Sequence, residues 1–395
     1  MNHEKAFLPP SPLFSIAVVS FDQERFIRDC LDSIFLQKYD NIELIICDDH
    51  SCDFEHQTIR EYIEANKSEN IKNVIIFRQQ KNVGISLNCQ KAFELSHGEY
   101  IKFQAADDML SHENVLSNIA SVFAHNQENV IFSRARACTN KGVLLQQIYP
   151  YDHNFSRASQ MSAGELFVAM STKTWGAYVC APAVFFRAQF LKECGGFDAS
   201  YKNMEDWPLW LKMTRQGKKP YYLNSITMIY RYGGISNRQS RQLWQTGKSH
   251  YEECSRMLKK EALPFLQDQA KRKDVLKCRQ CINALECKDA IDFDWGYMSI
   301  ADKIAWRLQN RRFLLQSWIS RFENAPFNWK ILKKSALLFA VVLICFSLRQ
   351  QSLAPNILYG ICLVLAYGSL FSMVLCLSWN FLIFCIKIRK RIGKW

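Results

Sequence analysis

Short apolar runs alternate with helix-like segments over the first 110 residues, and this alternation limits the possible folds more than any other feature of the sequence. The runs cover residues 15–21, 41–49, 74–77 and 100–106. Strands that alternate with helices form right-handed βαβ units, so the pattern predicts an α/β fold with a largely parallel sheet. The carboxyl ends of such strands meet at one edge, where open α/β sheets bind their ligands.

The segment after the first run has the spacing of a helix with one apolar face. The residues that recur on this face are Phe26, Ile27, Cys30, Leu31, Ile34 and Phe35. We expect this face to pack against the sheet.

Pairs of carboxylates stand where two of the apolar runs end. Asp48 and Asp49 close the second run, and Asp107 and Asp108 close the fourth. A single Asp-Asp pair is often a turn or the cap of a following helix. Two pairs at equivalent edges of a sheet, together with Phe21 at the end of the first run, predict a shared site.

The turn after the first run excludes two common kinds of phosphate site. Residues 20–23 contain no glycine, and no Gly-Lys-Ser or Gly-Lys-Thr follows a strand, so neither a dinucleotide fingerprint nor a P-loop is present. Carboxylates can instead hold a diphosphate through a divalent cation, Mg or Mn. We expect Asp107 and Asp108 at the metal, Asp49 as an acceptor for a base or ribose, and Phe21 stacked on the base.

Four blocks in this order, over roughly the first 110 residues, carry a resemblance to a known family. They are SIAVVSFDQERFIRDCLDSI, NIELIICDDHS, KNVGISLN and GEYIKFQAADD. Together they resemble the nucleotide-binding half of family 2 glycosyltransferases, which are inverting nucleotide-sugar enzymes. The resemblance implies the GT-A fold, a Rossmann-like, open, largely parallel mixed sheet flanked by helices.

The resemblance also implies roles for single residues. Phe21 and Asp49 would contact the nucleotide base, Asp107 the ribose or sugar, and Asp108 the metal that bridges the diphosphate. The expected nucleotide-sugar-binding residues are Val19, Phe21, Asp49, Gly84 and Asp107. The chain departs from the family in having Phe21 where tyrosine is more usual and Ala106 at the first position of the Asp-x-Asp motif.

A second acidic motif, in residues 204–213, suits the proton acceptor that a transferase needs. A sugar hydroxyl is a weak nucleophile at neutral pH, so a carboxylate should take its proton. Glu205 and Asp206 begin a predicted helix, and an ordinary acidic N-cap is the alternative. In the family that the chain resembles, the second acid of such a pair is the base, so we expect Asp206 to be catalytic. Trp175, Trp207 and Trp210 are expected either to stack on a sugar or to belong to the core.

Residues 229–236 resemble the strand that closes the domain. Some relatives have a histidine near this strand as an extra metal ligand, but this chain has Tyr232 and two glycines. Metal binding would then depend on Asp107 and Asp108 alone. Arg231 is a further expected contact of the diphosphate.

The formal net charge of +13 favours an anionic partner. Much of the basic excess lies in residues 238–288 and beside the terminal apolar runs, and no basic stripe is interleaved with aromatic residues. We therefore expect a membrane surface, and no nucleic acid, as the partner. Residues 1–12, with one lysine and three prolines, predict neither a secretory signal nor a transmembrane start.

Two apolar runs near the C-terminus predict a membrane hairpin. Residues 335–348 would form a helix of about 21 Å, short of the roughly 30 Å hydrocarbon core, whereas residues 356–386 are long enough. Basic residues flank the pair on the outside, which predicts cytoplasmic ends. A re-entrant or interfacial first helix is the alternative. We expect a catalytic domain on the cytoplasmic face of a membrane, the bacterial inner membrane.

The expected organisation has four parts. They are a tail at residues 1–13, a GT-A domain at 14–237 (nucleotide-sugar half 14–110, acceptor half 111–237), a basic helical segment at 238–330 and a membrane-associated hairpin at 331–395.

The predicted function is metal-dependent, inverting transfer of a sugar from a nucleotide sugar to a lipid-linked glycan in surface polysaccharide assembly, such as O-antigen or capsule. One alternative is transfer onto polyprenyl phosphate. An alternative of another class is a catalytically inactive, nucleotide-binding membrane scaffold.

Overall fold

The structure, a computed structural model, describes residues 11–52, 54–172, 178–232 and 242–289. The chain divides into two compact units, residues 1–298 and 299–395, and all the described residues lie in the first. Most of the predicted tail and the whole predicted hairpin at 331–395 lie outside the described residues. Within the described ranges, no helix combines the length and the apolar character that crossing a membrane requires.

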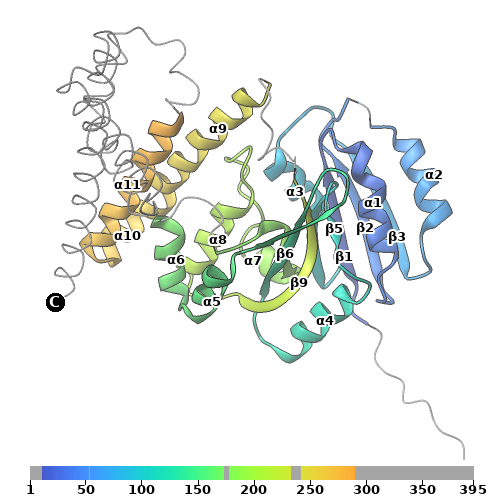
Figure 1. Cartoon of the computed structure of the whole chain (residues 1–395), viewed down its shortest axis with the longest axis horizontal. Coiled ribbons are helices and arrows are strands. Elements are labelled where there is room, and N and C mark those ends of the chain that lie inside the picture. Colours follow the sequence, from blue (N-terminus) through green and yellow to red (C-terminus); the bar gives the residue numbers. More distant parts are fainter. Residues whose placement is uncertain (1–10, 53, 173–177, 233–241, 290–395) are drawn as a thin grey trace, which may run out of the picture. The chain divides into compact units, whose positions relative to one another are not determined.

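One mixed sheet of nine strands runs through the described part of the chain (Figure 1). The strands are β1 (Phe14–Ser20), β2 (Ile42–Asp48), β3 (Ile71–Arg78), β4 (Tyr100–Ala105), β5 (Met109–Leu110), β6 (Val130–Cys138), β7 (Leu144–Tyr149), β8 (Val184–Arg187) and β9 (Tyr221–Arg231). Their order is β3-β2-β1-β4-β8-β6-β9-β5, and β7 pairs with β6.

The predicted parallel arrangement is confirmed for the first four strands that the sequence indicated. β1 pairs in parallel with β2 and β4, and β2 pairs in parallel with β3. In the ladder Ser20 lies opposite Asp48, and Val19 lies opposite Ala105. The ends of the three central strands are therefore level, which brings the segments that follow them to one edge.

The remainder of the sheet is mixed. β8 is antiparallel to both β4 and β6, β9 is parallel to β6, and β5 is antiparallel to β9. Of the strand predicted at residues 229–236, residues 229–231 form the end of β9, which begins at Tyr221; residues 233–236 lie outside the described residues. Polar Asn224 and Ser225 interrupt the apolar pattern in the first half of β9, so its start has no apolar signal.

Helices cover both faces of the sheet. They are α1 (Glu24–Phe35), α2 (His56–Asn66), α3 (Ile85–Glu94), α4 (Val115–His125), α5 (Asp152–Gln160), α6 (Ala163–Thr172), α7 (Ala188–Glu193), α8 (Asp206–Arg215), α9 (Gln242–Met257), α10 (Leu263–Gln269) and α11 (Arg272–Asp289), with a 3-10 turn η1 (Ala181–Ala183) and a π-helical turn η3 (Leu258–Ala262). α1, α2 and α4 share one core with the sheet, and α3 and α6 to α11 share the other.

Strand β1 separates these two cores because successive side chains point to opposite faces. Phe14, Ile16 and Val18 belong to the core under α1, and Ala17 and Val19 belong to the core under α3. All six apolar residues predicted for one face of α1 are buried. Each such side chain contributes about 1.5–3 kcal/mol of burial free energy.

The described part of the predicted helical segment packs with the same core as the preceding strands. Met257, Leu266, Cys281 and Leu285 are buried in the cluster that also contains residues of α3, α6 and α8. Figure 1 shows α9, α10 and α11 together; α11 contacts both α9 and α10 and also packs against α6. The boundary at 237/238 stays a prediction, and so does the membrane-facing role of this segment.

Candidate active site

The tips of the central strands are joined by backbone hydrogen bonds. The peptide N–H of Asp49 donates to the Ser20 carbonyl at 2.8 Å, and that of Ala106 donates to the Val19 carbonyl at 3.0 Å. Val19 is buried in the core, and Phe21, directly after β1, is half-buried. The predicted residues Val19, Phe21 and Asp49 thus lie at one edge of the sheet.

Asp49 holds the turn before α3. Its two carboxylate oxygens accept the peptide N–H groups of Val83 at 2.7 Å and Gly84 at 2.8 Å. Burial raises the pKa of Asp49, while these two N–H groups lower it. The predicted pair Asp49 and Gly84 is therefore in direct contact. A carboxylate has about four lone-pair sites, so capacity remains for the predicted contact with a base.

Asp48, the first member of the same acid pair, has a local structural role. Its carboxylate accepts the Ser51 peptide N–H at 2.9 Å and the Ser51 hydroxyl, and it lies 3.4 Å from Arg78. It is fully buried. Within this pair, only Asp49 lies against the Gly84 turn.

Asp108 fits the predicted metal ligand. Its Oδ1 accepts the Arg231 peptide N–H at 3.0 Å, whereas its buried Oδ2 has no hydrogen-bond partner in the described part of the chain. Burial, followed by the neighbouring Asp107, raises the pKa of Asp108 well above its ordinary value. A buried oxygen without a donor is costly unless a cation or a donor reaches it.

Asp108 has few neighbouring protein groups that could also bind a metal ion. Among the residues that the structure describes, no three His, Cys, Asp or Glu side chains are grouped closely enough to hold a metal ion. A cation at Asp108 would take its remaining ligands from donor phosphates and water, as Mg²⁺ commonly does. The residues present fit Mg or Mn on these terms.

Arg231 supports the two acids from within the protein. Its guanidinium donates to the Asp107 carbonyl at 3.0 Å and the Asn140 carbonyl at 2.9 Å, and pairs with Asp29 at 2.7 Å. It also lies over the Phe26 ring, 4.6 Å from the centroid. At 2% exposure, it anchors the Asp107 backbone, and the expected contact with a diphosphate stays a prediction.

Two residues near Asp108 were missed because residues 100–106 were interpreted as an apolar run. Lys102 is fully buried and donates from Nζ to the carbonyls of Phe103, at 2.9 Å, and Pro182. Burial lowers its pKa to about 8, and the Asp108 carboxylate opposes this shift. Gln104 donates to the Asp108 carbonyl at 3.1 Å. The available signal was a polar residue at every second position of the strand.

Glu205 and Asp206 begin helix α8, as expected. Asp206 Oδ1 accepts the Trp207 peptide N–H at 2.6 Å. Burial raises the pKa of Asp206, while the Trp207 N–H and then His250 lower it. Burial, and then Asp206, raise the pKa of Glu205 to about 8. Burial thus raises the pKa of both acids, and the neighbouring charge of Asp206 adds to the rise at Glu205.

The tryptophans near this motif belong mainly to the core. Trp210 is 4% exposed and stacks on Phe186 at 5.7 Å between ring centroids. Trp207 is half-buried and packs against the same cluster. Its expected contact with a sugar stays a prediction. Trp175, another candidate, lies outside the described residues.

Two buried thiols relate the three acids to one another. The pKa of Cys180 is raised to about 12 by burial and, in addition, by Asp108 and Asp206. Burial also raises the pKa of Cys89, and Asp206 and Asp49 add to it. The charges of Asp108 and Asp206 thus both act on the Cys180 thiol, and those of Asp49 and Asp206 both act on the Cys89 thiol.

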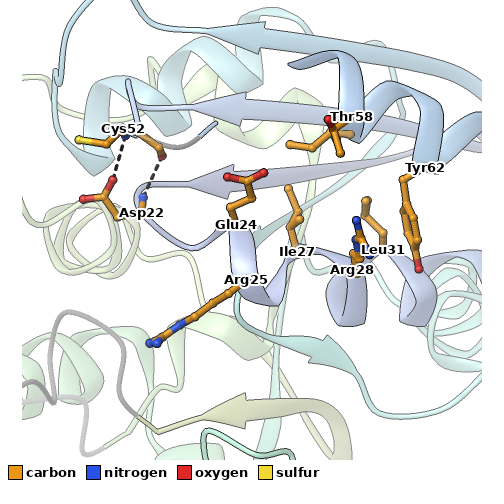
Figure 2. Close-up of a pocket in the computed structure, with 11 residues that line it drawn as sticks. Asp22, Glu24, Arg25, Ile27, Arg28, Leu31, Cys52, Thr58 and Tyr62 are labelled. Carbon is orange, nitrogen blue, oxygen red and sulfur yellow. Dashed lines mark hydrogen bonds between the residues drawn. The ribbon is translucent and has the colours of Figure 1, made fainter. Parts of the chain in front are cut away.

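A separate cavity of about 670 Å³ lies between α1 and α2 (Figure 2). At its end the Asp22 peptide N–H donates to Ser51 Oγ at 2.8 Å, and the Cys52 peptide N–H donates to Asp22 Oδ1 at 3.2 Å. None of the predicted site residues lines this cavity. It borders the Phe21 turn and lies on the α1 face.

Comparison with known proteins places these features in context. Residues 15–191 match the family model described as Glycosyl transferase family 2. A provisionally assigned glycosyltransferase, EpsE of Bacillus subtilis (strain 168), is 28% identical over 217 residues, which are 54% of this chain and 70% of EpsE. Chondroitin synthase of Escherichia coli is 27% identical over 216 residues, 54% of this chain and 28% of the synthase.

A solved structure is also similar to this chain. The crystal structure of S. aureus TarS in complex with UDP-GlcNAc aligns with a TM-score of 0.49 at 15% identity, covering 76% of this chain and 80% of that one. Asp206, Arg231 and helix α9 all follow the last residue of the family match.

Proposed function

Since residues 15–191 place this chain in glycosyl transferase family 2, we propose that it transfers a sugar from a nucleotide-sugar donor to a glycan acceptor with inversion, on a GT-A fold. One observation carries the proposal. Gly84, whose peptide N–H donates to Asp49, packs against Lys202, so the segment that leads into Asp206 contacts the turn that Asp49 holds. A base and a donor-binding edge at one place are what sugar transfer to a hydroxyl requires.

The donor is held by the nucleotide half. Asp49 fixes the Val83–Gly84 turn through two hydrogen bonds, and this turn with Phe21 forms the support for the nucleotide. Asp108, with its buried Oδ2, would hold Mg or Mn against the diphosphate. When bound, such a cation neutralises the charge that develops on the leaving diphosphate.

The acceptor hydroxyl is activated from the other half. Asp206 accepts its proton as the oxygen attacks the sugar carbon. The positive end of α8 and the Trp207 N–H favour the ionised form of Asp206 before the proton arrives. Attack by the hydroxyl on the side opposite the diphosphate inverts the configuration in a single displacement.

We propose that the acceptor is a lipid-linked glycan at a membrane. The catalytic domain would lie on the cytoplasmic face of that membrane. Two apolar runs with basic flanks, residues 335–348 and 356–386, support membrane attachment. One relative is named as the synthase of a polysaccharide, chondroitin, which supports a role in surface polysaccharide assembly.

The test is a panel of nucleotide sugars presented to the full chain with Mg²⁺, with Mn²⁺ and with chelator. We expect one donor to raise the melting temperature only when metal is present, because a ligand that binds the folded form stabilises it. The same donor should lose its sugar to a glycan acceptor. The proposal fails if no donor is both bound and consumed.

A further inference from the structure

The segment that leads into Asp206, residues 196–203 (the linker segment), contacts helix α3 on one side. Gln90 Oε1 accepts the Phe197 peptide N–H at 3.0 Å. Gly84, at the start of α3, lies so close to Lys202 that an added Cβ would be 2.3 Å from its Cγ and 2.4 Å from its carbonyl oxygen. The linker segment therefore touches the turn that Asp49 holds.

Helix α9 forms hydrogen bonds with the backbone of the same linker segment. Glu253 is 7% exposed, and its two carboxylate oxygens accept the peptide N–H groups of Lys202 at 2.7 Å and Asn203 at 2.8 Å. Arg256, one turn later, donates to the Ser200 carbonyl at 2.7 Å. Two consecutive peptide groups are thus fixed by one buried carboxylate.

These bonds lie close to the proposed base. Only Met204 and Glu205 separate Asn203 from Asp206, and Met204 Sδ lies 3.7 Å from Cys254 Sγ on α9. Hydrogen bonds that a carboxylate accepts from peptide N–H groups are short and strong. Their geometry sets where α8 begins, and with it the position of the Asp206 carboxylate.

We propose that Glu253 is a positioning residue, which holds Asp206 in register with the donor-binding Gly84 turn through the backbone of the linker segment. The proposal rests on the proposed function and extends it to a helix that lies beyond residue 191, where the family match ends. Helix α9 is then part of the catalytic unit.

The experiment compares the full-length chain with Glu253→Gln, which keeps the side-chain size but replaces one acceptor oxygen by an amide donor. Glu252→Gln, at the exposed neighbouring position of α9, is the matched control. Two quantities are measured: hydrogen exchange of the Lys202 and Asn203 amides, and kcat with the donor KM.

We expect Glu253→Gln to speed exchange at Lys202 and Asn203, because a peptide N–H that loses its acceptor opens more readily. We expect kcat to fall about 10- to 100-fold, the range for a small misplacement of a catalytic group, with little change in the donor KM. Glu252→Gln should change neither quantity.

A double-mutant cycle separates positioning from general destabilisation. In an Asp206→Asn background Glu253→Gln should cost almost nothing further in kcat, since the group that it positions is already lost. If Glu253→Gln lowers kcat by the same factor in the unchanged chain and in Asp206→Asn, Glu253 does not position Asp206. Unchanged amide exchange or unchanged kcat in Glu253→Gln alone also overturns the proposal. If Glu253→Gln fails to fold, Glu253→Asp, which keeps the charge but withdraws the carboxylate from the Lys202 and Asn203 amides by one methylene group, is subjected to the same measurements and the same criteria.

Failure of this inference can be told from failure of the proposed function. Hydrogen exchange reports on the bond from Glu253 whether or not sugar is transferred. Absence of transfer by the unchanged chain overturns the proposed function and, with it, a catalytic role for this bond.

Discussion

At the scale of single residues, helix α8 begins with two adjacent acids whose pKa values are both raised by burial. Burial and the charge of Asp206 raise the pKa of Glu205 to about 8. The folded state then keeps a proton that the unfolded state has lost at neutral pH. The stability contributed by protonated Glu205 is complete below its unfolded pKa and is lost as pH rises through about 8.

Replacing Glu205 by glutamine should therefore change the pH dependence of stability. We expect the melting temperature of Glu205→Gln to exceed that of the unchanged chain increasingly from about pH 5 to about pH 8, the range between the unfolded and folded pKa values of Glu205, because glutamine has no proton to lose. Thermal unfolding across this range measures the difference. Glu193→Gln, at an exposed position, is the control. Parallel pH profiles for Glu205→Gln and the unchanged chain would show that Glu205 ionises normally.

Asp108 makes a second prediction at this scale. Its burial without a donor at Oδ2 is a cost to the metal-free protein. We expect Asp108→Asn to unfold at the same temperature as the unchanged chain or higher without metal, and to lose the metal-dependent stabilisation by donor. Differential scanning fluorimetry with Mn²⁺ and with chelator measures both effects. Asp40→Asn, on the exposed surface, should keep the full metal response; a full response in Asp108→Asn would remove Asp108 from the metal site.

At the scale of elements, the turn before α3 requires glycine. Gly84 has φ 91° and ψ 164°, a region that other residues essentially do not adopt. Lys202 also leaves no space for a Cβ. Backbone conformation and packing thus both connect this turn with the linker segment.

Gly84→Ala should destabilise the chain by about 1–3 kcal/mol or more, and it should weaken donor binding. Gly142→Ala is the matched control, because Gly142 also has a positive φ, of 80°, but no atom lies within 4 Å of the place that an added Cβ would take. Urea unfolding of both variants separates strain from contact with Lys202. Equal losses in the two variants would mean that the contact contributes nothing.

The elements that the sequence predicted well are those with a local signal. β1, β2 and β4 occur within about one residue of the predicted runs, because apolar residues predominate in β1 and β2 and alternate with polar ones in β4. β7 has no buried residue and β5 has only two residues, so neither has a readable period. Their places are fixed by pairing with β6 and β9.

The candidate site residues also differ in whether they have a local signal in the sequence. Asp49, Asp108 and Asp206 could be chosen as candidates from the sequence because each follows or begins an element with a strong local pattern. The supports could not, since Arg231 and Glu253 act on residues 124 and 51 positions away. Such long-range contacts depend on the folded arrangement of several elements, which one sequence does not reveal.

At the scale of the whole molecule, the proposed active site has two parts. The first half of the chain supplies the sheet edge that would bind the donor, and the second half supplies the proposed base, Asp206. The described part of the C-terminal helical segment shares a core with both. Because the proposed base and the donor-binding residues come from different halves of the chain, replacing Asp206 should leave donor binding unchanged.

The most direct test measures donor affinity and transfer rate together for Asp206→Asn in the full chain. The account predicts an unchanged donor Kd and a loss in kcat of about 100- to 10,000-fold, the contribution typical of a general base, while Asp268→Asn, on the exposed side of α10, keeps full activity. An Asp206→Asn protein that binds the donor and transfers sugar at the rate of the unchanged chain would contradict it.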